Sequence, residues 1–581
     1  PGHGREDFET AVKYDLEVYS PVDDDGCFTA DVPYFAGQFV FDANNGVNEK
    51  IAEVGNLVRK ESITHTYPHC WRCKEPVIFR ATEQWFISME SNDLRQKALQ
   101  TIEKEVKWVP GWGQERIYGM IENRPDWCIS RQRAWGVPIT VFYCQECNEI
   151  LTDSAVLEHV ISRFAEKGAD IWFAEEAVDL LPAGTKCSEC GGSTFTKEMD
   201  ILDVWFESGV SYAAVLEPRE DLHSPADLYL EGSDQHRGWF HSSLLAAVGT
   251  RGHAPYRTVL THGFVVDGTG RKMSKSLGNV IAPDEVIQKY GAEILRLWVA
   301  AEDYRDDIRI SEEILQRLSE AYRRIRNTCR FLLGNLSDFD PERDRVHVTS
   351  MDSLDRWALH RLQQLAKKVV QAYESFEFHK IYHAIHNFCV VDLSAFYLDV
   401  LKDRLYVSAA TSEKRRSAQT AIFEIAVTLV RLMAPILAFT ADEVWEHLPA
   451  FSGKSESVHL ELLPEPVAAY EDEAIEEEWE SILDTRAEVN RALELARKNK
   501  EVGHSLDAEV TIGISGPLLE RLRGQENVLS RVFIVSKVRL AEAESIEAGV
   551  EAVDIPGMLI QVKPASAEKC GRCWIHDESV G

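Results

Sequence analysis

The sequence predicts a multidomain α/β protein that combines a doubly wound, Rossmann-like nucleotide-binding sheet, an inserted zinc ribbon and an all-α helix bundle. Three observations lead to this prediction. Between residues 201 and 266, short apolar runs are followed by glycine turns and helix starts, as in doubly wound sheets. Two Cys-x-x-Cys pairs lie about forty residues apart in the first half of the chain. From about residue 300 onward, apolar residues recur at spacings of three and four, which predicts packed helices.

Size and charge limit the classes of protein to consider. A chain of 581 residues with 45% hydrophobic residues predicts several globular domains. A net charge of -32 argues against indiscriminate nucleic-acid binding, although basic islands such as residues 323–326 exist. The longest apolar run, residues 426–439, is interrupted by Arg431 and Pro435, so we expect no membrane segment.

Cysteine usage indicates metal binding in a reducing compartment. The chain has twelve cysteines, and eight of them form four Cys-x-x-Cys pairs. This is too few for a disulfide framework in a chain of this length, so we expect a cytoplasmic protein.

The first 85 residues mix short strands with glycine turns. We expect a helix that ends near Tyr14, a turn and strand over residues 21–28, and strands over residues 77–87. Cys70 and Cys73 form the first pair, but two thiolates do not fill a tetrahedral zinc site.

The second and third pairs predict a complete zinc ribbon. Their two tight turns bring four thiolates together and leave no ligand position open for water, which is typical of a structural zinc site. Residues 154–167, between the pairs, have helical spacing. The predicted ligands are Cys144, Cys147, Cys187 and Cys190.

Two predicted strand ends supply a candidate ligand pocket. Residues 201–209 are expected to form a strand that ends in glycine, and residues 227–240 a strand, a glycine turn and a helix start. In doubly wound sheets ligands bind at the carboxyl ends of strands, where a carboxylate can accept hydrogen bonds from a ribose or an ammonium group. The residues expected there are Glu231, Gly232, Asp234 and Gln235.

Two tryptophans could line this pocket. Trp205 and Trp239 could form the walls of an apolar side-chain site, and packing in the core is the alternative for both. For Asp234 the alternative is a helix cap.

A cationic loop follows the predicted sheet. We expect a strand over residues 263–266, a hairpin turn at Asp267 and Gly268, and a helix that starts at residue 283. The intervening loop places Lys272 and Lys275 three residues apart between glycines that could act as hinges. Two ammonium groups on a mobile loop suit a triphosphate whose leaving pyrophosphate gains negative charge; a hydrated surface loop is the alternative.

The rest of the chain is predominantly helical. Residues 354–362, 387–401 and 418–437 carry helical apolar spacing, with Pro435 expected to kink the last helix. The region after residue 480 combines a helix over residues 482–500 with short strands near residues 510 and 532. The fourth cysteine pair, Cys570 and Cys573, is half of a zinc knuckle near the end of the chain.

The string Lys272-Met273-Ser274-Lys275-Ser276 resembles the KMSKS signature of the class I aminoacyl-tRNA synthetases. Residues 231–240, Glu-Gly-Ser-Asp-Gln-His-Arg-Gly-Trp-Phe, are similar to the isoleucine-specific branch of that family rather than its valine or leucine branches. The opening residues 1–23 look like the end of an editing domain. The resemblance covers nearly the whole chain.

The resemblance implies roles for individual residues. The residue matching Glu231 contacts the aminoacyl-adenylate, Asp234 and Gln235 hold the polar end of the amino acid, and the two tryptophans flank its side chain. Lys275 binds ATP, and Lys272 acts with it on the departing pyrophosphate. Asp7 contacts the amino group of a mischarged amino acid during editing, and the helix bundle reads the anticodon.

The resemblance also implies the domain limits. We expect the last part of a β-rich editing domain at 1–85, the second half of the catalytic domain at 86–300 with the ribbon at about 140–195, connecting helices at 301–350, the anticodon-binding bundle at 351–470, and an α+β region ending in a truncated knuckle at 471–581.

The implied activity is ATP-dependent attachment of isoleucine to its tRNA through an isoleucyl-adenylate, with hydrolytic editing of mischarged valine. The expected partners are tRNA, ATP and isoleucine, the expected ions are Zn²⁺ and the Mg²⁺ that accompanies ATP, and the expected state is a monomer. The sequence contains no His-x-Gly-His string, the other signature of the family. We therefore expect a fragment that lacks an N-terminal part and the extreme C-terminus, and that is inactive alone.

Two alternatives are open from the sequence. The chain could be a non-catalytic tRNA-binding paralogue that keeps the bundle and the zinc sites. It could also be a valyl or leucyl enzyme of the same family.

Overall fold

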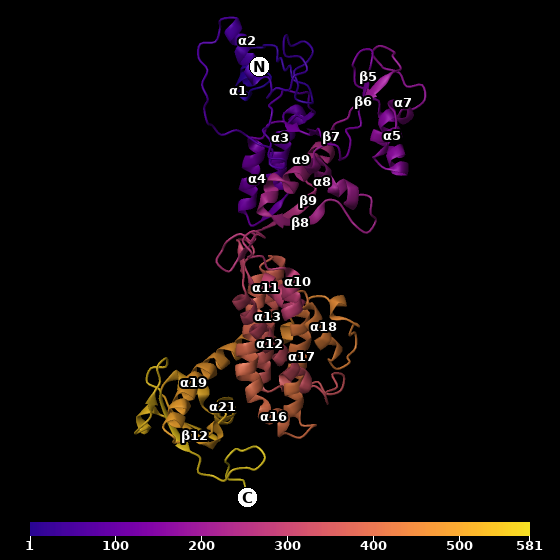
Figure 1. Cartoon of the computed structure of the whole chain (residues 1–581). Helices are drawn as coiled ribbons and strands as arrows, with labels where there is room; N and C mark the ends of the chain where they lie inside the picture. Colours follow the sequence, from indigo (N-terminus) through magenta and orange to yellow (C-terminus); the bar gives the residue numbers. More distant parts are fainter. Residues whose placement is uncertain (581) are drawn as a thin grey trace. The chain divides into compact units, whose positions relative to one another are not determined.

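The computed structural model describes residues 1–580, and the chain divides into two units, Pro1–Thr261 and His262–Gly581 (Figure 1). Among the described residues, none of the helices combines the length and the apolar composition that crossing a membrane requires.

The first 85 residues of the first unit contain little regular structure. Helix α1 (Arg5–Lys13) confirms the helix expected to end near Tyr14, and α2 (Asn44–Glu53) follows. The strands expected over residues 77–87 are wrong except at β1 (Phe86–Ile87), which pairs with β3 (Trp127–Cys128). Residues 51–69 are exposed throughout, and no strand among the described residues pairs with residues 77–85. A strand needs a neighbour to satisfy its backbone groups, so apolar composition alone does not create one.

A three-stranded sheet in the order β2-β9-β8 forms the centre of the first unit. Strands β2 and β9 are parallel, with Trp108 opposite Val259, and the chain order β8, α9, β9 is a strand–helix–strand unit. Helix α9 buries nine consecutive residues from Phe240 to Val248, which explains why its sequence is nearly continuous in small and apolar residues. The elements are β2 (Lys107–Val109), β8 (Ala226–Gly232), β9 (Tyr256–His262), α3 (Leu94–Lys104), α4 (Trp112–Glu122) and α9 (Trp239–Arg251).

The predicted ribbon forms a small module with its own core (Figure 1). Strands β5 and β6 pair antiparallel, and α5 spans Ser154–Lys167, as the helical spacing predicts. Trp172 is fully buried and its ring lies 4.9 Å from that of Phe142. The elements are β5 (Phe142–Cys144), α5 (Ser154–Lys167), α6 (Ile171–Ala174), α7 (Ala177–Leu180) and β6 (Phe195–Lys197).

The prediction of a strand through residues 201–209 is wrong. Strand β7 (Ile201–Leu202) has two residues and pairs with β4 (Ser130–Arg131), and helix α8 (Val204–Gly209) begins immediately afterwards. The buried Asp203 starts this helix, because its carboxylate accepts a hydrogen bond from the backbone N–H of Trp205 at 3.3 Å. An aspartate N-cap therefore outweighs the β propensity of the valine and aromatic residues that follow it.

The second unit begins with the strand that carries the cationic loop. Strand β10 pairs in parallel with β11, so that Asp267 lies opposite Ile310. The turn expected at Asp267 and Gly268 is present but longer, because it closes between Asp267 and Gly270. The elements are β10 (Val265–Asp267), α10 (Pro283–Tyr290), α11 (Ala292–Ala301), β11 (Ile308–Ile310) and α12 (Glu312–Gly334).

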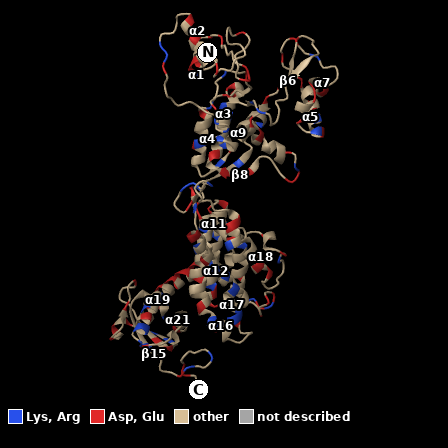
Figure 2. Ribbon diagram, in the orientation of Figure 1, with Lys and Arg blue, Asp and Glu red and all other residues tan. Residues whose placement is uncertain are grey.

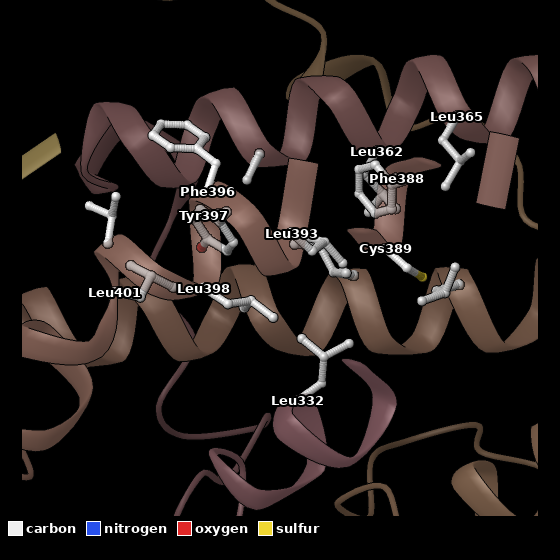
Figure 3. Packing of buried hydrophobic residues seen from close by; sticks show 14 of the residues in the cluster. Leu332, Leu362, Leu365, Phe388, Cys389, Leu393, Phe396, Tyr397, Leu398 and Leu401 are labelled. Atoms are coloured by element: carbon white, nitrogen blue, oxygen red, sulfur yellow. The ribbon is translucent and has the colours of Figure 1, made fainter. Parts of the chain in front are cut away.

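The helix bundle packs around one continuous apolar core. Figure 3 shows part of it, with Leu332 from α12, Leu362 from α13, and Phe388 and Leu393 pointing into a shared interior. Pro435 does not kink a helix as expected, since α17 ends before it and α18 starts after it. The elements are α13 (Ser353–Glu374), α14 (Phe378–Asn387), the π-helical stretch η5 (Phe388–Tyr397), α15 (Leu398–Val400), α16 (Lys402–Tyr406), α17 (Glu413–Met433) and α18 (Ala438–Glu446).

The C-terminal region is an α+β layer with a four-stranded sheet in the order β13-β12-β15-β14. Its long helix α19 starts at Glu473, earlier than predicted, and its first turns are rich in acidic residues (Figure 2). The strand expected near Val532 is wrong, since residues 526–533 form α21. The elements are α19 (Glu473–Lys498), β12 (Ala508–Gly513), α20 (Pro517–Leu522), α21 (Glu526–Phe533), β13 (Lys537–Ala541), β14 (Val550–Glu551) and β15 (Leu559–Pro564).

Candidate functional site

Four predicted site residues gather at the carboxyl end of β8. Glu231 is exposed, and its Oε2 accepts a hydrogen bond from the backbone N–H of Gly232 at 2.9 Å. A short helical turn, η3 (Ser233–Arg237), follows directly. Within it Gln235 donates to the carboxylate of Asp234 at 2.9 Å and accepts from the backbone N–H of Trp239 at 2.8 Å. The amide of Gln235 is therefore fixed in orientation, and its NH₂ group and the Asp234 carboxylate form one polar pair.

Trp205 and Trp239 both lie beside the η3 turn that carries this polar pair. Trp239 is stacked on Tyr229, with 4.0 Å between the ring centres, and its indole N–H donates to the carbonyl of Ser208 at 3.0 Å. A Cβ atom at Gly238 would lie 3.0 Å from the Trp205 ring and 2.5 Å from Gln235 Oε1, so only glycine allows this packing. Trp205 remains 42% exposed, which argues against core packing as its main role.

The η3 turn rests on a buried imidazole that the sequence analysis did not single out. His236 is fully buried between aromatic rings, and its Nδ1 lies 3.1 Å from the Ser233 carbonyl, so Nδ1 carries the proton. Burial lowers the pKa of His236 and keeps the ring neutral. Asp234 makes no cap to the turn, so the helix-cap alternative does not hold.

The lysine loop lies in the second unit, between β10 and α10. Gly270 and Gly278 flank it with φ values of 84° and 63°, which other residues adopt only with strain. The side chains of Lys272 and Lys275 are exposed, and across residues 1–580 neither ammonium group has a hydrogen-bond or ion-pair partner. Met273, between them, packs against the apolar core of the unit. The loop thus presents two uncompensated ammonium groups on an anchored backbone.

The four middle cysteines form a centre that fits a zinc ion. Their sulfur atoms all lie within 4.8 Å of one another, with 3.5 Å between Cys144 and Cys190 and 3.6 Å between Cys147 and Cys187. Tetrahedral zinc with bonds of about 2.3 Å requires sulfur separations of about 3.8 Å. Hydrogen bonds from the backbone N–H groups of Cys190 and Glu189 lower the pKa of the Cys187 thiol to about 7, which favours the thiolate at this position, whereas the pKa values of Cys147 and Cys190 are raised.

The other two pairs have the same loop shape. In each, two backbone hydrogen bonds close the loop. The N–H of Cys70 donates to the carbonyl of Glu75 at 2.8 Å, and the N–H of Lys74 donates to the carbonyl of Cys70 at 2.9 Å. The corresponding distances are 2.9 Å from Cys570 to Ile575 and 3.0 Å from Trp574 to Cys570. Backbone N–H groups again lower the pKa of Cys70, to about 7, and that of Cys570. Neither pair belongs to a group of three or more metal-binding side chains within residues 1–580. Cys70 with Cys73, and Cys570 with Cys573, are therefore preformed half-sites.

Asp7, the predicted editing residue, is exposed on α1. Its carboxylate covers Gly4, where a Cβ atom would lie 2.7 Å from Oδ2. The sequence Gly4-Arg5-Glu6-Asp7 thus places this carboxylate against the backbone at the start of the helix.

Comparisons with known proteins identify the family of the chain. The family model described as "tRNA synthetases class I (I, L, M and V)" matches residues 8–311, and the model "Anticodon-binding domain of tRNA ligase" matches residues 355–512. The whole chain is 61% identical to the protein named "Isoleucine--tRNA ligase" from Geobacter sulfurreducens, 59% identical to that of Syntrophotalea carbinolica and 53% identical to that of Moorella thermoacetica. The chain spans 62% of the length of each of these relatives. The chain belongs to the class I tRNA synthetases of the isoleucine, leucine, methionine and valine group.

Proposed function

We propose that the protein to which this chain belongs attaches isoleucine to its tRNA through an isoleucyl-adenylate. The observation that carries the proposal is identity of 51 to 61% along the entire chain to relatives that are all named as isoleucine-tRNA ligases. The matched region covers the whole chain and therefore includes the β8 strand end, the lysine loop and the bundle. The similarity supports the isoleucyl enzyme and does not favour the two alternatives, which are a non-catalytic tRNA-binding paralogue and a valyl or leucyl enzyme.

In the first step, the isoleucine carboxylate attacks the α-phosphate of ATP, an acyl–phosphate bond forms, and the bond to the β-phosphate breaks to release pyrophosphate. Lys272 and Lys275 offset the charge that develops on that pyrophosphate, and Mg²⁺ enters with ATP. Glu231 and the Asp234–Gln235 pair hold the adenylate, with the carboxylates accepting hydrogen bonds from hydroxyl or ammonium groups. In the second step, a hydroxyl of the terminal tRNA ribose attacks the acyl carbon and AMP leaves.

Trp205 and Trp239 provide the apolar walls that select the side chain. One methylene group in such a pocket contributes about 1 to 3 kcal/mol to the discrimination between two amino acids. This range includes the known discrimination between isoleucine and valine by isoleucyl enzymes. Valine is therefore charged at a low rate and needs hydrolytic removal. We propose that residues 1–85, with Asp7 among them, contribute the last part of the domain that performs this editing.

The remaining regions serve tRNA binding and stability. We propose that the helices from α13 to α18 bind the anticodon region, in line with the matching family model. The thiolates of Cys144, Cys147, Cys187 and Cys190 would hold a structural Zn²⁺, which when bound ties the two ribbon loops together. We further propose that the protein acts as a cytoplasmic monomer.

Pyrophosphate exchange tests the proposal. A protein that joins this chain to the N-terminal segment of its relatives should exchange pyrophosphate into ATP when isoleucine is present, and much more slowly with valine. The chain by itself should show no exchange, because it lacks a His-x-Gly-His string. Exchange with valine or leucine alone, or none with any amino acid in the joined protein, would refute the proposal.

The lysine loop provides a second test. Lys275→Ala in the joined protein should reduce adenylate formation by on the order of 100-fold or more, the range for removing one transition-state contact, and leave tRNA affinity nearly unchanged. Lys97→Ala, which removes an exposed lysine from α3, is the matched control. Equal losses of adenylate formation and tRNA affinity would make Lys275 a general phosphate contact instead.

A further inference from the structure

The lysine loop is tied together at its base by two side chains that stand outside its glycines. Asp267, the last residue of β10, is 8% exposed and accepts at both carboxylate oxygens. Its Oδ1 accepts from the N–H and hydroxyl of Thr269 at 2.9 and 2.6 Å and from the N–H of Arg271 at 3.0 Å. Its Oδ2 accepts from the Nδ2 of Asn279 at 2.9 Å. The carboxylate therefore joins the start of the loop to the residue that follows it.

Asn279 extends this connection to the backbone between the lysines. Its Nδ2 also donates to the carbonyl of Lys272 at 3.3 Å, and its Oδ1 accepts from the N–H of Ser274 at 2.9 Å. These two groups lie on either side of Met273, whose side chain packs toward the core. One carboxamide thus fixes the segment 272–274 by donating and accepting at the same time, which neither a carboxylate nor an alkyl side chain can do.

The same contacts determine which cations are free. Arg271 is engaged, because its Nε lies 3.3 Å from Asp267 Oδ2. Thr269, Asn279 and the backbone of Arg271 hold the pKa of Asp267 far below its usual range, so the carboxylate stays charged at any working pH. Lys272 and Lys275 remain as the two cations of the signature string without a partner in the described chain.

We propose that Asp267 and Asn279 are positioning residues for adenylate formation, which hold the Lys272–Lys275 segment in the geometry that meets the departing pyrophosphate. The proposal rests on the proposed function. Fixing the backbone before the substrate arrives avoids an ordering cost during the reaction, and a misplacement of about 1 Å costs on the order of 100-fold in rate.

The test uses four variants of the joined protein. Asn279→Ala removes all three bonds of the carboxamide, and Asn279→Asp keeps its shape but has no N–H group and faces the Asp267 carboxylate. Asp267→Asn with Asn279→Asp exchanges the partners and restores one donor and one acceptor between the two positions. Asn527→Ala, an exposed asparagine on α21 in the same unit whose side chain makes no hydrogen bond among the described residues, is the control.

We expect Asn279→Ala to lower kcat for pyrophosphate exchange by on the order of 10- to 100-fold while the KM for isoleucine changes little. Asn279→Asp should be at least as slow. The exchanged pair should be faster than Asn279→Asp by about fivefold, the effect of one restored hydrogen bond. Asn527→Ala should match the unchanged protein.

A second measurement does not depend on activity. In the chain as it stands, Asn279→Ala should speed tryptic cleavage after Lys272 and Lys275, and the exchanged pair should slow it again. Unchanged kcat and cleavage rates in Asn279→Ala would overturn the proposal while leaving the proposed function intact. Absence of exchange in the unsubstituted joined protein would instead refute the proposed function.

Discussion

Four Cys-x-x-Cys loops in this chain share one backbone conformation, yet only two of them meet. In all four, the residue after the second cysteine has a positive φ: 68° at Lys74, 61° at Asn148, 77° at Gly191 and 64° at Trp574. The loops at Cys144 and Cys187 lie at the ends of paired strands and bring four sulfur atoms together. The loops at Cys70 and Cys570 stand alone among the described residues.

The difference teaches that the knuckle shape does not depend on the metal site. Each loop makes the same two backbone hydrogen bonds whether or not a second pair lies opposite. The proposed zinc site makes the loops differ in what would hold them to their surroundings: thiolate ligation in the ribbon, and ordinary side-chain contacts elsewhere. The predictions below test that difference, beginning with the largest effect.

Removal of one ribbon ligand should have the largest effect. Cys187→Ser should abolish binding of one zinc per chain and unfold the ribbon locally, because structural zinc contributes on the order of 10 kcal/mol. Metal analysis after gel filtration checks this, and Cys70→Ser is the matched control that should leave the zinc in place. If Cys187→Ser kept its zinc and Cys70→Ser lost it, the metal would be bound by the Cys70 loop and not by the ribbon.

The helix bundle extends the comparison to a region where the described residues form no metal-binding cluster. The fully buried Asp355 accepts hydrogen bonds from Arg404 at 3.1 Å, from the hydroxyl of Tyr397 at 2.8 Å and from Ser417. Asp355→Ala should lower the free energy of unfolding of the bundle by about 3 to 5 kcal/mol, because it leaves the Arg404 charge buried without its main partner.

Denaturant unfolding followed by circular dichroism measures this loss. The control is Asp284→Ala, which removes an exposed carboxylate on α10. A chelator should not change the unfolding of the bundle; a chelator-sensitive bundle would show that the metal stabilises more than the ribbon.

The positive-φ position tests whether the loops are equivalent. Gly191→Ala should weaken zinc binding by about tenfold, since a side chain in the left-handed region costs about 1 to 2 kcal/mol. Competition with a chromophoric chelator measures this effect, with Ser193→Ala as control; a weaker site in Ser193→Ala than in Gly191→Ala would contradict the argument.

The same backbone cost can be removed in the Cys70 loop. Lys74→Gly replaces a side chain in the left-handed region by glycine and should slow amide exchange in residues 70–75.

The smallest effect concerns the C-terminal half-site, which an ion pair holds to the sheet. Asp507 lies 2.6 Å from Lys569 Nζ and 3.3 Å from His576, and these contacts, that with Lys569 first, lower the pKa of Asp507 to about 2. Because the folded pKa lies below the unfolded value, this stabilisation is present above about pH 4 and is lost as the pH falls towards 2.

The pair is partly exposed, so Asp507→Asn should cost at most about 1 kcal/mol. The protection factors of the amides of residues 570–574, which correct for the intrinsic slowing of exchange in acid, should fall in acid or high salt and stay constant with a chelator. The reverse pattern would mean that metal, not charge, holds this loop.

Much of the chain could be predicted from local sequence. The helix at residues 154–167, the strand and turn at 226–237 and the helix starting at Pro283 follow from apolar spacing and capping residues. The errors lie where one polar group or a missing neighbour decided the outcome. Asp203 turned an expected strand into α8, and residues 77–85 lack a strand to pair with in the described chain.

The candidate site divides in the same way. Its signature strings predicted the lysines, the Glu231 strand end and the cysteine ligands as site residues, because the roles proposed for them depend on their own chemistry. Sequence reasoning did not assign a role to Asn279, Gly238 or His236, whose importance lies in what they contact: a loop backbone, a tryptophan ring and the η3 turn. A polar residue directly after a signature loop is the only signal that could have pointed to Asn279.

The sequence by itself determined the four knuckles, the helical second half and the chemistry of the site, since each depends on residues within a few positions of one another. Only the tertiary structure decided which knuckles meet, how the Trp205 ring packs against Gly238, and how Asp267 and Asn279 close the lysine loop. The physical reason is the distance along the chain between interacting groups. Backbone hydrogen bonds and helix caps join residues that are close in sequence, whereas metal ligation, ring packing and side-chain hydrogen bonds between separate segments form only when folding brings those segments together.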